Sequence, residues 1–230
     1  MKTIGLIGGM SWESSIEYYR IVNETVKEKL GSLHSAKSLM VSVDFAEIEK
    51  LQREDRWEEA GEILAKCAQD LERGGADFIV LCSNTMHKLA AQMMAGVKIP
   101  LLHIADAAAE RIMTAGIKKI GLLGTRFTME QDFYKRRLSD KFGLEVLIPA
   151  EPDRRMIDRV IFEELVQGKV LESSRAEYKR IMETLTKRGA EGILLGCTEI
   201  ELLVKREDCR VPLFATASIH AAAAVEYALQ

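Results

Sequence analysis

The amino-acid sequence predicts an α/β protein made of two similar parallel-sheet α/β domains related by internal duplication, with the active site in the crevice between them. Three observations lead to this prediction. Short β-rich runs alternate with long amphipathic stretches, as in parallel sheets covered by helices on both faces. Three sequence blocks recur in the same order. The 230 residues suffice for two units of roughly 115 residues each.

Apolar runs that end in glycine or polar residues predict the strands, and apolar residues at helical spacing predict the helices. For the first half this gives strands over 3–8, 39–43, 77–82 and 99–102, and helices over 12–30, 56–73 and 105–114. A capping box of Ser14 and Glu17 is expected to open the first helix, and Gly74-Gly75 to end the second.

The second half repeats this order at nearly constant offsets of 116, 114 and 112 residues, which indicates duplication of a whole domain. The repeated blocks are centred on Ile4 and Ile120, Ser83 and Cys197, and Pro100 and Pro212. No linker rich in proline, serine or glycine separates the halves. The expected domains are residues 1–98 with 210–230, and residues 99–209, so that the end of the chain returns to the first domain.

Composition excludes several classes of function. With 32 basic and 35 acidic side chains the net charge is −3, which provides no field for nucleic acid or an anionic membrane. No apolar run approaches the roughly 18–20 residues of a membrane span. Four cysteines are too few for a disulfide scaffold. A cytoplasmic protein without a nucleic-acid or membrane partner is therefore expected.

Common cofactor motifs are also missing. The glycines that follow the first strand do not form a dinucleotide fingerprint or a Walker A loop. The spacing of cysteines and histidines is not that of a metal site, and there is no nucleophile elbow. No cofactor or metal is expected.

Polar residues cluster where the predicted strands end, which is where parallel α/β sheets bind ligands. These places are 8–11, 83–85, Thr125, Thr128 and 197–199. Each set taken alone is better explained by helix capping. The duplication, however, places Ser83 and Cys197 at equivalent positions, from which they would face one crevice from opposite sides.

Cys197 is the cysteine with the setting of an activated thiol. It follows a buried strand, and the dipole of the helix beyond it would favour the thiolate. The alternative is a small buried hydrophobe. That alternative suits Cys67 and Cys209, and strand alternation turns Cys82 away from the crevice into the core.

These residues together resemble the aspartate/glutamate racemase family of cofactor-independent amino-acid racemases. The resemblance covers essentially the whole chain, through the segments 4–10, 83–87, 121–125 and 196–199. The opening 9–14 is similar to a bacterial branch of the family, here with a hydroxyl residue in place of the first catalytic cysteine. The resemblance implies two similar α/β domains, a homodimer, a small-molecule amino-acid substrate and no pyridoxal phosphate, metal or nucleotide.

The resemblance also implies the roles of the site residues. Racemisation removes the Cα proton from one face and returns a proton to the other, so a base and an acid must flank the substrate. Ser83 and Cys197 stand at the positions of the two catalytic residues. The expected substrate-binding residues are Met10, Gln52, Asn84, Thr85, Thr125, Thr198 and Glu199.

Three positions depart from the family pattern. Ser83 replaces a cysteine and is a poor base, so Cys197 is expected to be the main base and to act on the L-enantiomer. Ala215 replaces an aspartate that is common before the last helix. Val166 stands about where aspartate-selective members have a lysine, and Gln52 or Arg53, in the loop region after the second strand, is the expected substitute for it. The substrate is L-aspartate, L-glutamate or a broader set.

Two other functions fit the same residues. A single active-site cysteine is compatible with a decarboxylase or isomerase of the same superfamily. Ser83 and Ala215 together also fit a weakened amino-acid-binding or regulatory protein.

Overall fold

The structure, a computed structural model, describes residues 1–230 and divides into two compact units. Unit 1 comprises Met1–Ile104 and His220–Gln230, and unit 2 comprises Ala105–Ile219. The divisions lie later along the chain than the expected 98/99 and 209/210. They differ because the strand at Leu101–Leu102 pairs within the first sheet and the strand at Leu213–Ala215 within the second.

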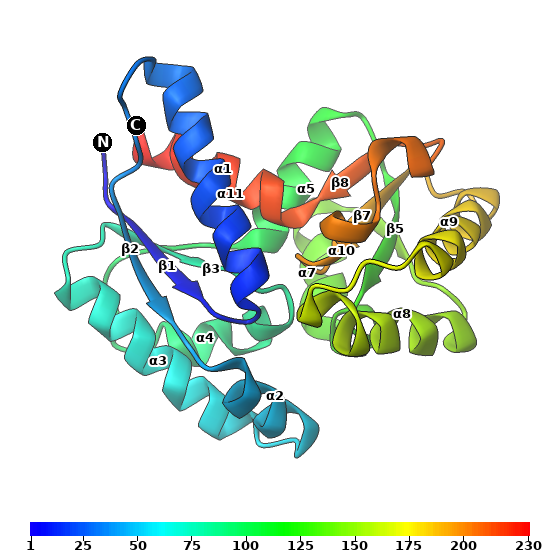
Figure 1. Cartoon of the computed structure of the whole chain (residues 1–230), viewed down its shortest axis with the longest axis horizontal. Helices are drawn as coiled ribbons and strands as arrows, with labels where there is room; N and C mark the ends of the chain where they lie inside the picture. Colours follow the sequence, from blue (N-terminus) through cyan, green and yellow to red (C-terminus); the bar gives the residue numbers. More distant parts are fainter. The chain divides into compact units, whose positions relative to one another are not determined.

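Unit 1 contains a four-stranded parallel sheet with the order β2-β1-β3-β4. Figure 1 labels the first three of these strands. Its elements are β1 (Ile4–Gly8), α1 (Trp12–Leu30), β2 (Ser38–Ser42), α2 (Phe45–Arg53), α3 (Trp57–Arg73), β3 (Phe78–Leu81), the 3-10 helix η1 (Thr85–Leu89), α4 (Ala90–Met93) and β4 (Leu101–Leu102). Every residue of the two central strands, β1 and β3, is buried. The sheet therefore forms the centre of the apolar core of this unit.

Unit 2 repeats the pattern with the order β6-β5-β7-β8. Its elements are β5 (Lys119–Gly124), α6 (Arg126–Glu130), α7 (Asp132–Phe142), β6 (Glu145–Leu147), α8 (Glu151–Glu163), η2 (Leu165–Gln167), α9 (Glu172–Lys187), β7 (Gly192–Gly196), α10 (Ile200–Leu203), η3 (Arg206–Asp208) and β8 (Leu213–Ala215). Two helices cross the divisions between the units: α5 (Ile104–Thr114) and α11 (Thr216–Ala228). The matching strand orders confirm the predicted α/β fold with two parallel sheets.

Helix α1 spans the predicted residues, but its predicted cap is wrong. Tyr18, Val22 and Val26 are buried at helical spacing, which explains why this stretch forms an amphipathic helix. The N-cap is Ser11, whose side chain accepts a hydrogen bond from Ser14 N at 3.4 Å. Ser11 holds the extended backbone that a cap residue needs, whereas Ser14 already lies inside the helix.

Helix α2 was not predicted from the sequence. It has only nine residues, so its apolar period is short. Asp44 caps it by accepting a hydrogen bond from Ala46 N at 3.0 Å, and Ile48 and Leu51 are buried. The consequence for the site is that Gln52 and Arg53 belong to a helix and not to the loop expected from the sequence.

The last helix returns to unit 1 through its residues from His220 onward. Lys2 N donates a hydrogen bond to Ala228 O at 2.8 Å, and the rings of Phe78 and Tyr227 lie edge to face at 4.8 Å. His220 is fully buried, and its Nε2 donates to Leu102 O at 2.8 Å while its Nδ1 accepts from Tyr18 Oη at 3.0 Å. Burial lowers the pKa of His220 to about 4, so the ring is neutral.

This histidine makes the stability of unit 1 depend on pH. The unfolded chain protonates His220 near its ordinary pKa of about 6.5, whereas the folded chain resists protonation until about pH 4. The unfolded state therefore binds more protons in this window, and stability is lost as the pH falls through it, by at most about 3 kcal/mol. Thermal unfolding between pH 7 and pH 4.5 should show a steeper loss in the wild type than in His220→Gln.

The exposed His34 provides the control, because its ring is in solvent in both states. His34→Gln should keep the wild-type dependence on pH. Parallel curves for the wild type and His220→Gln would contradict the assignment.

Candidate active site

In unit 1, the residues expected to form the site follow the ends of β1 and β3. Ile7 and Leu81 are register partners in these parallel strands, and Cys82 N extends the pairing by donating to Ile7 O at 2.9 Å. Ser83 is the next residue. It is buried, and its Oγ accepts a hydrogen bond from Met86 N at 3.4 Å. Asn84 and Thr85, both buried, continue into η1.

His87 holds the backbone of Ser83 in place. Its Nδ1 donates to Ser83 O at 2.6 Å, and its Nε2 accepts from Ile104 N at 3.2 Å. A carbonyl oxygen can only accept and a backbone N–H can only donate, so both contacts require the same neutral tautomer with the proton on Nδ1. The ring thus joins the segment after β3 to the start of α5.

Met10 and Gln52 also belong to this part of unit 1. Met10 is buried in the turn after β1, and Gln52 is buried on α2. The Gln52 Nε2 atom lies 2.9 Å from Met86 Sδ, in the segment that follows Ser83. Arg53 instead points to solvent, where it forms an ion pair with Glu49. The structure therefore favours Gln52 over Arg53 as a site residue.

In unit 2, the corresponding residues follow β5 and β7. Gly124 and Gly196 are register partners, and the next residues along the two strands are Thr125 and Cys197. Thr125 caps α6 by accepting from Thr128 N at 3.3 Å, and the two threonine Oγ1 atoms are 3.2 Å apart. Cys197 occupies in this sheet the position that Ser83 occupies in the sheet of unit 1.

Cys197 and Thr198 share one hydrogen-bond acceptor. The Sγ atom of Cys197 donates to Glu199 Oε2 at 3.0 Å, and Thr198 Oγ1 donates to the same oxygen at 2.9 Å. All three side chains are buried. The structure thus brings the three expected residues of this segment into one hydrogen-bonded group.

The expectation of a thiol activated in the resting protein is wrong. Burial, followed by the charge of Glu199, raises the pKa of Cys197 well above its ordinary value. The helix that was expected to favour the thiolate, α10, has only four residues and begins at Ile200. The acidic Asp158 raises the pKa of the thiol further. At rest Cys197 is a neutral thiol.

The structure agrees with the structural roles expected for Cys67 and Cys82. Both are buried, and burial raises the pKa of each thiol. Cys209 is only partly buried, in the segment after η3.

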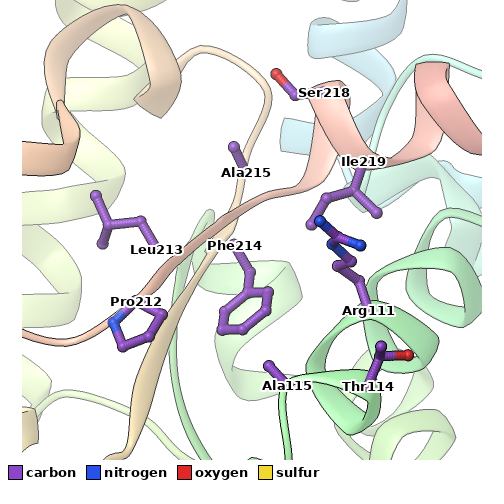
Figure 2. Close-up of a pocket in the computed structure, with 9 residues that line it drawn as sticks. All are labelled: Arg111, Thr114, Ala115, Pro212, Leu213, Phe214, Ala215, Ser218 and Ile219. Carbon is purple, nitrogen blue, oxygen red and sulfur yellow. The ribbon is translucent and has the colours of Figure 1, made fainter.

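Ala215 ends β8 and lines an open groove of about 550 Å³ in unit 2, with Arg111 and Thr114 of α5 on another side (Figure 2). Ser218, which also lines the groove, donates a hydrogen bond through Oγ to the carboxylate of Glu201 at 2.7 Å. Glu201 is half-buried and also accepts from Ala217 N at 2.8 Å. Sequence reasoning missed this residue, although it is the second glutamate of the segment 197–201. Val166, the third departure, is half-buried in η2.

The structure shows neither a cluster of possible metal ligands nor a membrane-spanning helix. No three or more His, Cys, Asp or Glu side chains are grouped so that they could hold a metal ion. None of the helices combines the length and the apolar character needed to cross a bilayer.

Comparison with known proteins identifies the family. A family model described as Asp/Glu/Hydantoin racemase matches residues 7–224. The chain belongs to this family. A crystal structure of a Yersinia pestis protein provisionally assigned as an Asp/Glu racemase is 54% identical, with a TM-score of 0.93 and 100% of both chains covered. An aspartate racemase homologue from Pyrococcus horikoshii OT3 is 36% identical, with a TM-score of 0.86 and the same coverage.

A curated relative is more distant. The broad specificity amino-acid racemase RacX of Bacillus subtilis (strain 168) is 25% identical over 146 residues. This match covers 64% of the present chain and 62% of RacX, so the chain spans less than two thirds of that protein. The Asp/Glu racemase fold expected from the sequence motifs is confirmed over the full length by the two crystal structures.

The turn between β1 and Met10 depends on a glycine. Gly9 has φ +91°, and a Cβ atom there would lie 2.2 Å from Val43 O and 2.6 Å from Val43 N. Gly31 has a similar φ of +80° with no atom within 4 Å of the corresponding Cβ position. We expect Gly31→Ala to cost about 1–2 kcal/mol from the left-handed backbone alone, and Gly9→Ala to cost several kcal/mol more because the backbone of Val43 must move. Urea unfolding measures both, and equal losses would contradict this account.

Proposed function

We propose that this protein is a cofactor-independent racemase of a free amino acid. One observation carries the proposal: Ser83 and Cys197 occupy matching positions, beyond the equivalent strands β3 and β7 of two sheets with the same strand order. Duplicated halves that each supply one proton-transferring group suit a reaction that acts on two faces of one carbon atom. Membership of the racemase family gives independent support.

In the proposed reaction, Cys197 takes the Cα proton of the L-enantiomer and Ser83 acts on the opposite face. A hydroxyl group is a far weaker base than a thiolate but can donate a proton to a carbanion. The enzyme is therefore asymmetric and works best on L-amino acids. Because Cys197 is a neutral thiol at rest, it must lose its proton before it can act as the base.

The proposed substrate is L-aspartate, L-glutamate or a broader set of amino acids. The names of relatives span this range, from an aspartate racemase homologue to a broad specificity amino-acid racemase. We assign substrate binding to Met10, Gln52, Asn84, Thr85, Thr125, Thr198 and Glu199. The side-chain amide of Gln52, buried near the segment after Ser83, suits a polar substrate group. Independence from pyridoxal phosphate, the homodimer and the cytoplasmic location stay predictions.

Deuterium exchange tests the reaction and separates the two roles. In heavy water, the wild type should exchange the Cα hydrogen of L-aspartate or L-glutamate and form the D-enantiomer. Cys197→Ala should abolish both. Ser83→Ala should retain exchange into the L-enantiomer while inversion falls about 100-fold or more, because the thiolate still removes and returns a proton on one face. Mass spectrometry and chiral chromatography measure the two quantities.

Cys209→Ala is the matched control, since it removes a partly buried cysteine of the same unit that lies outside the proposed site. It should leave exchange and inversion at the wild-type rates. Failure to exchange any of the proteinogenic amino acids would refute the proposed function. Tight calorimetric binding without turnover, with turnover restored in Ser83→Cys, would indicate an amino-acid-binding protein.

The neutral thiol supports a second candidate, a decarboxylase of the same superfamily. Loss of carbon dioxide leaves a carbanion that needs only one proton donor, and a buried neutral thiol is such a donor. Release of carbon dioxide from disubstituted malonates, together with no amino-acid exchange, would favour this candidate over the racemase.

A further inference from the structure

The contacts of Cys197 lead to a specific role for its neighbour. We propose that Glu199 accepts the thiol proton of Cys197, so that the base of the reaction is a cysteine–glutamate pair and not a cysteine alone. This inference rests on the proposed function, because the pair is assigned to removal of the Cα proton. It changes the expected role of Glu199 from substrate binding to proton transfer.

The geometry is that of a proton donor and its acceptor. The distance from Cys197 Sγ to Glu199 Oε2 is 3.0 Å, which is short for a hydrogen bond from sulfur. The same carboxylate oxygen accepts from Thr198 Oγ1 at 2.9 Å, which fixes its position. Glu199 is 2% exposed, so water has little access to the carboxylate.

The charges around the pair make transfer to Glu199 the less costly way to form a thiolate. Titratable groups that act on the pair include Asp158 on α8, Tyr178 on α9 and Glu201 on α10. None of them is basic. Loss of the thiol proton to water would add a second buried negative charge beside Glu199, whereas transfer within the pair leaves the net charge unchanged.

The proton balance of the proposed step is as follows. The S–H bond breaks and an O–H bond forms at Glu199, which gives a thiolate and a neutral carboxyl group. The thiolate then takes the Cα proton, and Ser83 gives its hydroxyl proton to the carbanion. After the product has left and solvent enters the site, Glu199 gives up its proton and Ser83 regains one, so no net proton is gained or lost.

Glu199→Gln tests the proposal because the amide keeps the size of the side chain and can accept a hydrogen bond but cannot take the proton. Two rates are measured: Cα exchange of L-aspartate in heavy water, and alkylation of Cys197 by iodoacetamide followed by mass spectrometry of the peptide. Exchange should fall about 100-fold or more. Alkylation at pH 7.5 should become faster, because removing the negative charge eases ionisation of the thiol.

These opposite changes distinguish proton transfer from a structural role, which would lower exchange without making the thiol more reactive. Glu207→Gln is the matched control, since Glu207 is an exposed glutamate on η3 of the same unit and is not assigned to the site. It should leave exchange within a few-fold of the wild type. Circular dichroism checks that each variant is folded.

Exchange that is unchanged or faster in Glu199→Gln would overturn the proposal, because Glu199 would then only suppress the base. If the wild type exchanges no amino acid, the proposed function fails by itself. Alkylation alone then tests the pair. A faster rate in Glu199→Gln supports the interaction between Glu199 and the thiol proton, and an unchanged or slower rate overturns the proposed pair.

Discussion

Parallel pairing of the two central strands in each unit positions the residues assigned to the site, apart from Gln52 on α2. Ile7 pairs with Leu81 in one sheet, and Gly124 pairs with Gly196 in the other. Since side chains that follow paired residues emerge at the same sheet edge, this register brings the segment after β1 close to Ser83, and Thr125 close to Cys197. A shift by one residue would turn Ser83 and Cys197 into the core, where Cys82 now lies. The proposed chemistry therefore depends on strand register before it depends on the reactive groups themselves.

The buried surroundings of Cys197 determine the protonation state of its thiol in the resting protein. A buried thiol beside a carboxylate is stable as a neutral group, which protects it at rest from ionisation and from the reactions of a thiolate. The same carboxylate offers a nearby place for the proton. One contact, between Sγ and Oε2, thus accounts for an unreactive resting state and for a route to the reactive one. This is why the raised pKa of Cys197 is compatible with its assignment as the base.

Much of the fold could be predicted from the sequence because its signals are local and repeated. The strand ends and the long helices follow from apolar periodicity, and the equivalence of Ser83 and Cys197 follows from the duplication. Short elements with little periodicity could not be predicted in this way, as α2 and the cap at Ser11 illustrate. The charge state of Cys197 also escaped prediction, since it depends on burial and on Asp158, which lies far away in the sequence.

The two halves share a fold but hold their reactive residues differently. In unit 1 the backbone of Ser83 is fixed by the neutral ring of His87, and the Ser83 hydroxyl accepts a hydrogen bond from an uncharged backbone amide, Met86 N. In unit 2 the thiol of Cys197 donates directly to a carboxylate. A hydroxyl group needs no proton acceptor if its task is to give a proton, whereas a thiol needs one if its task is to become a base. The difference between the two environments matches the difference between the two proposed roles, which argues that Ser83 is suited to its position and is not simply a lost cysteine.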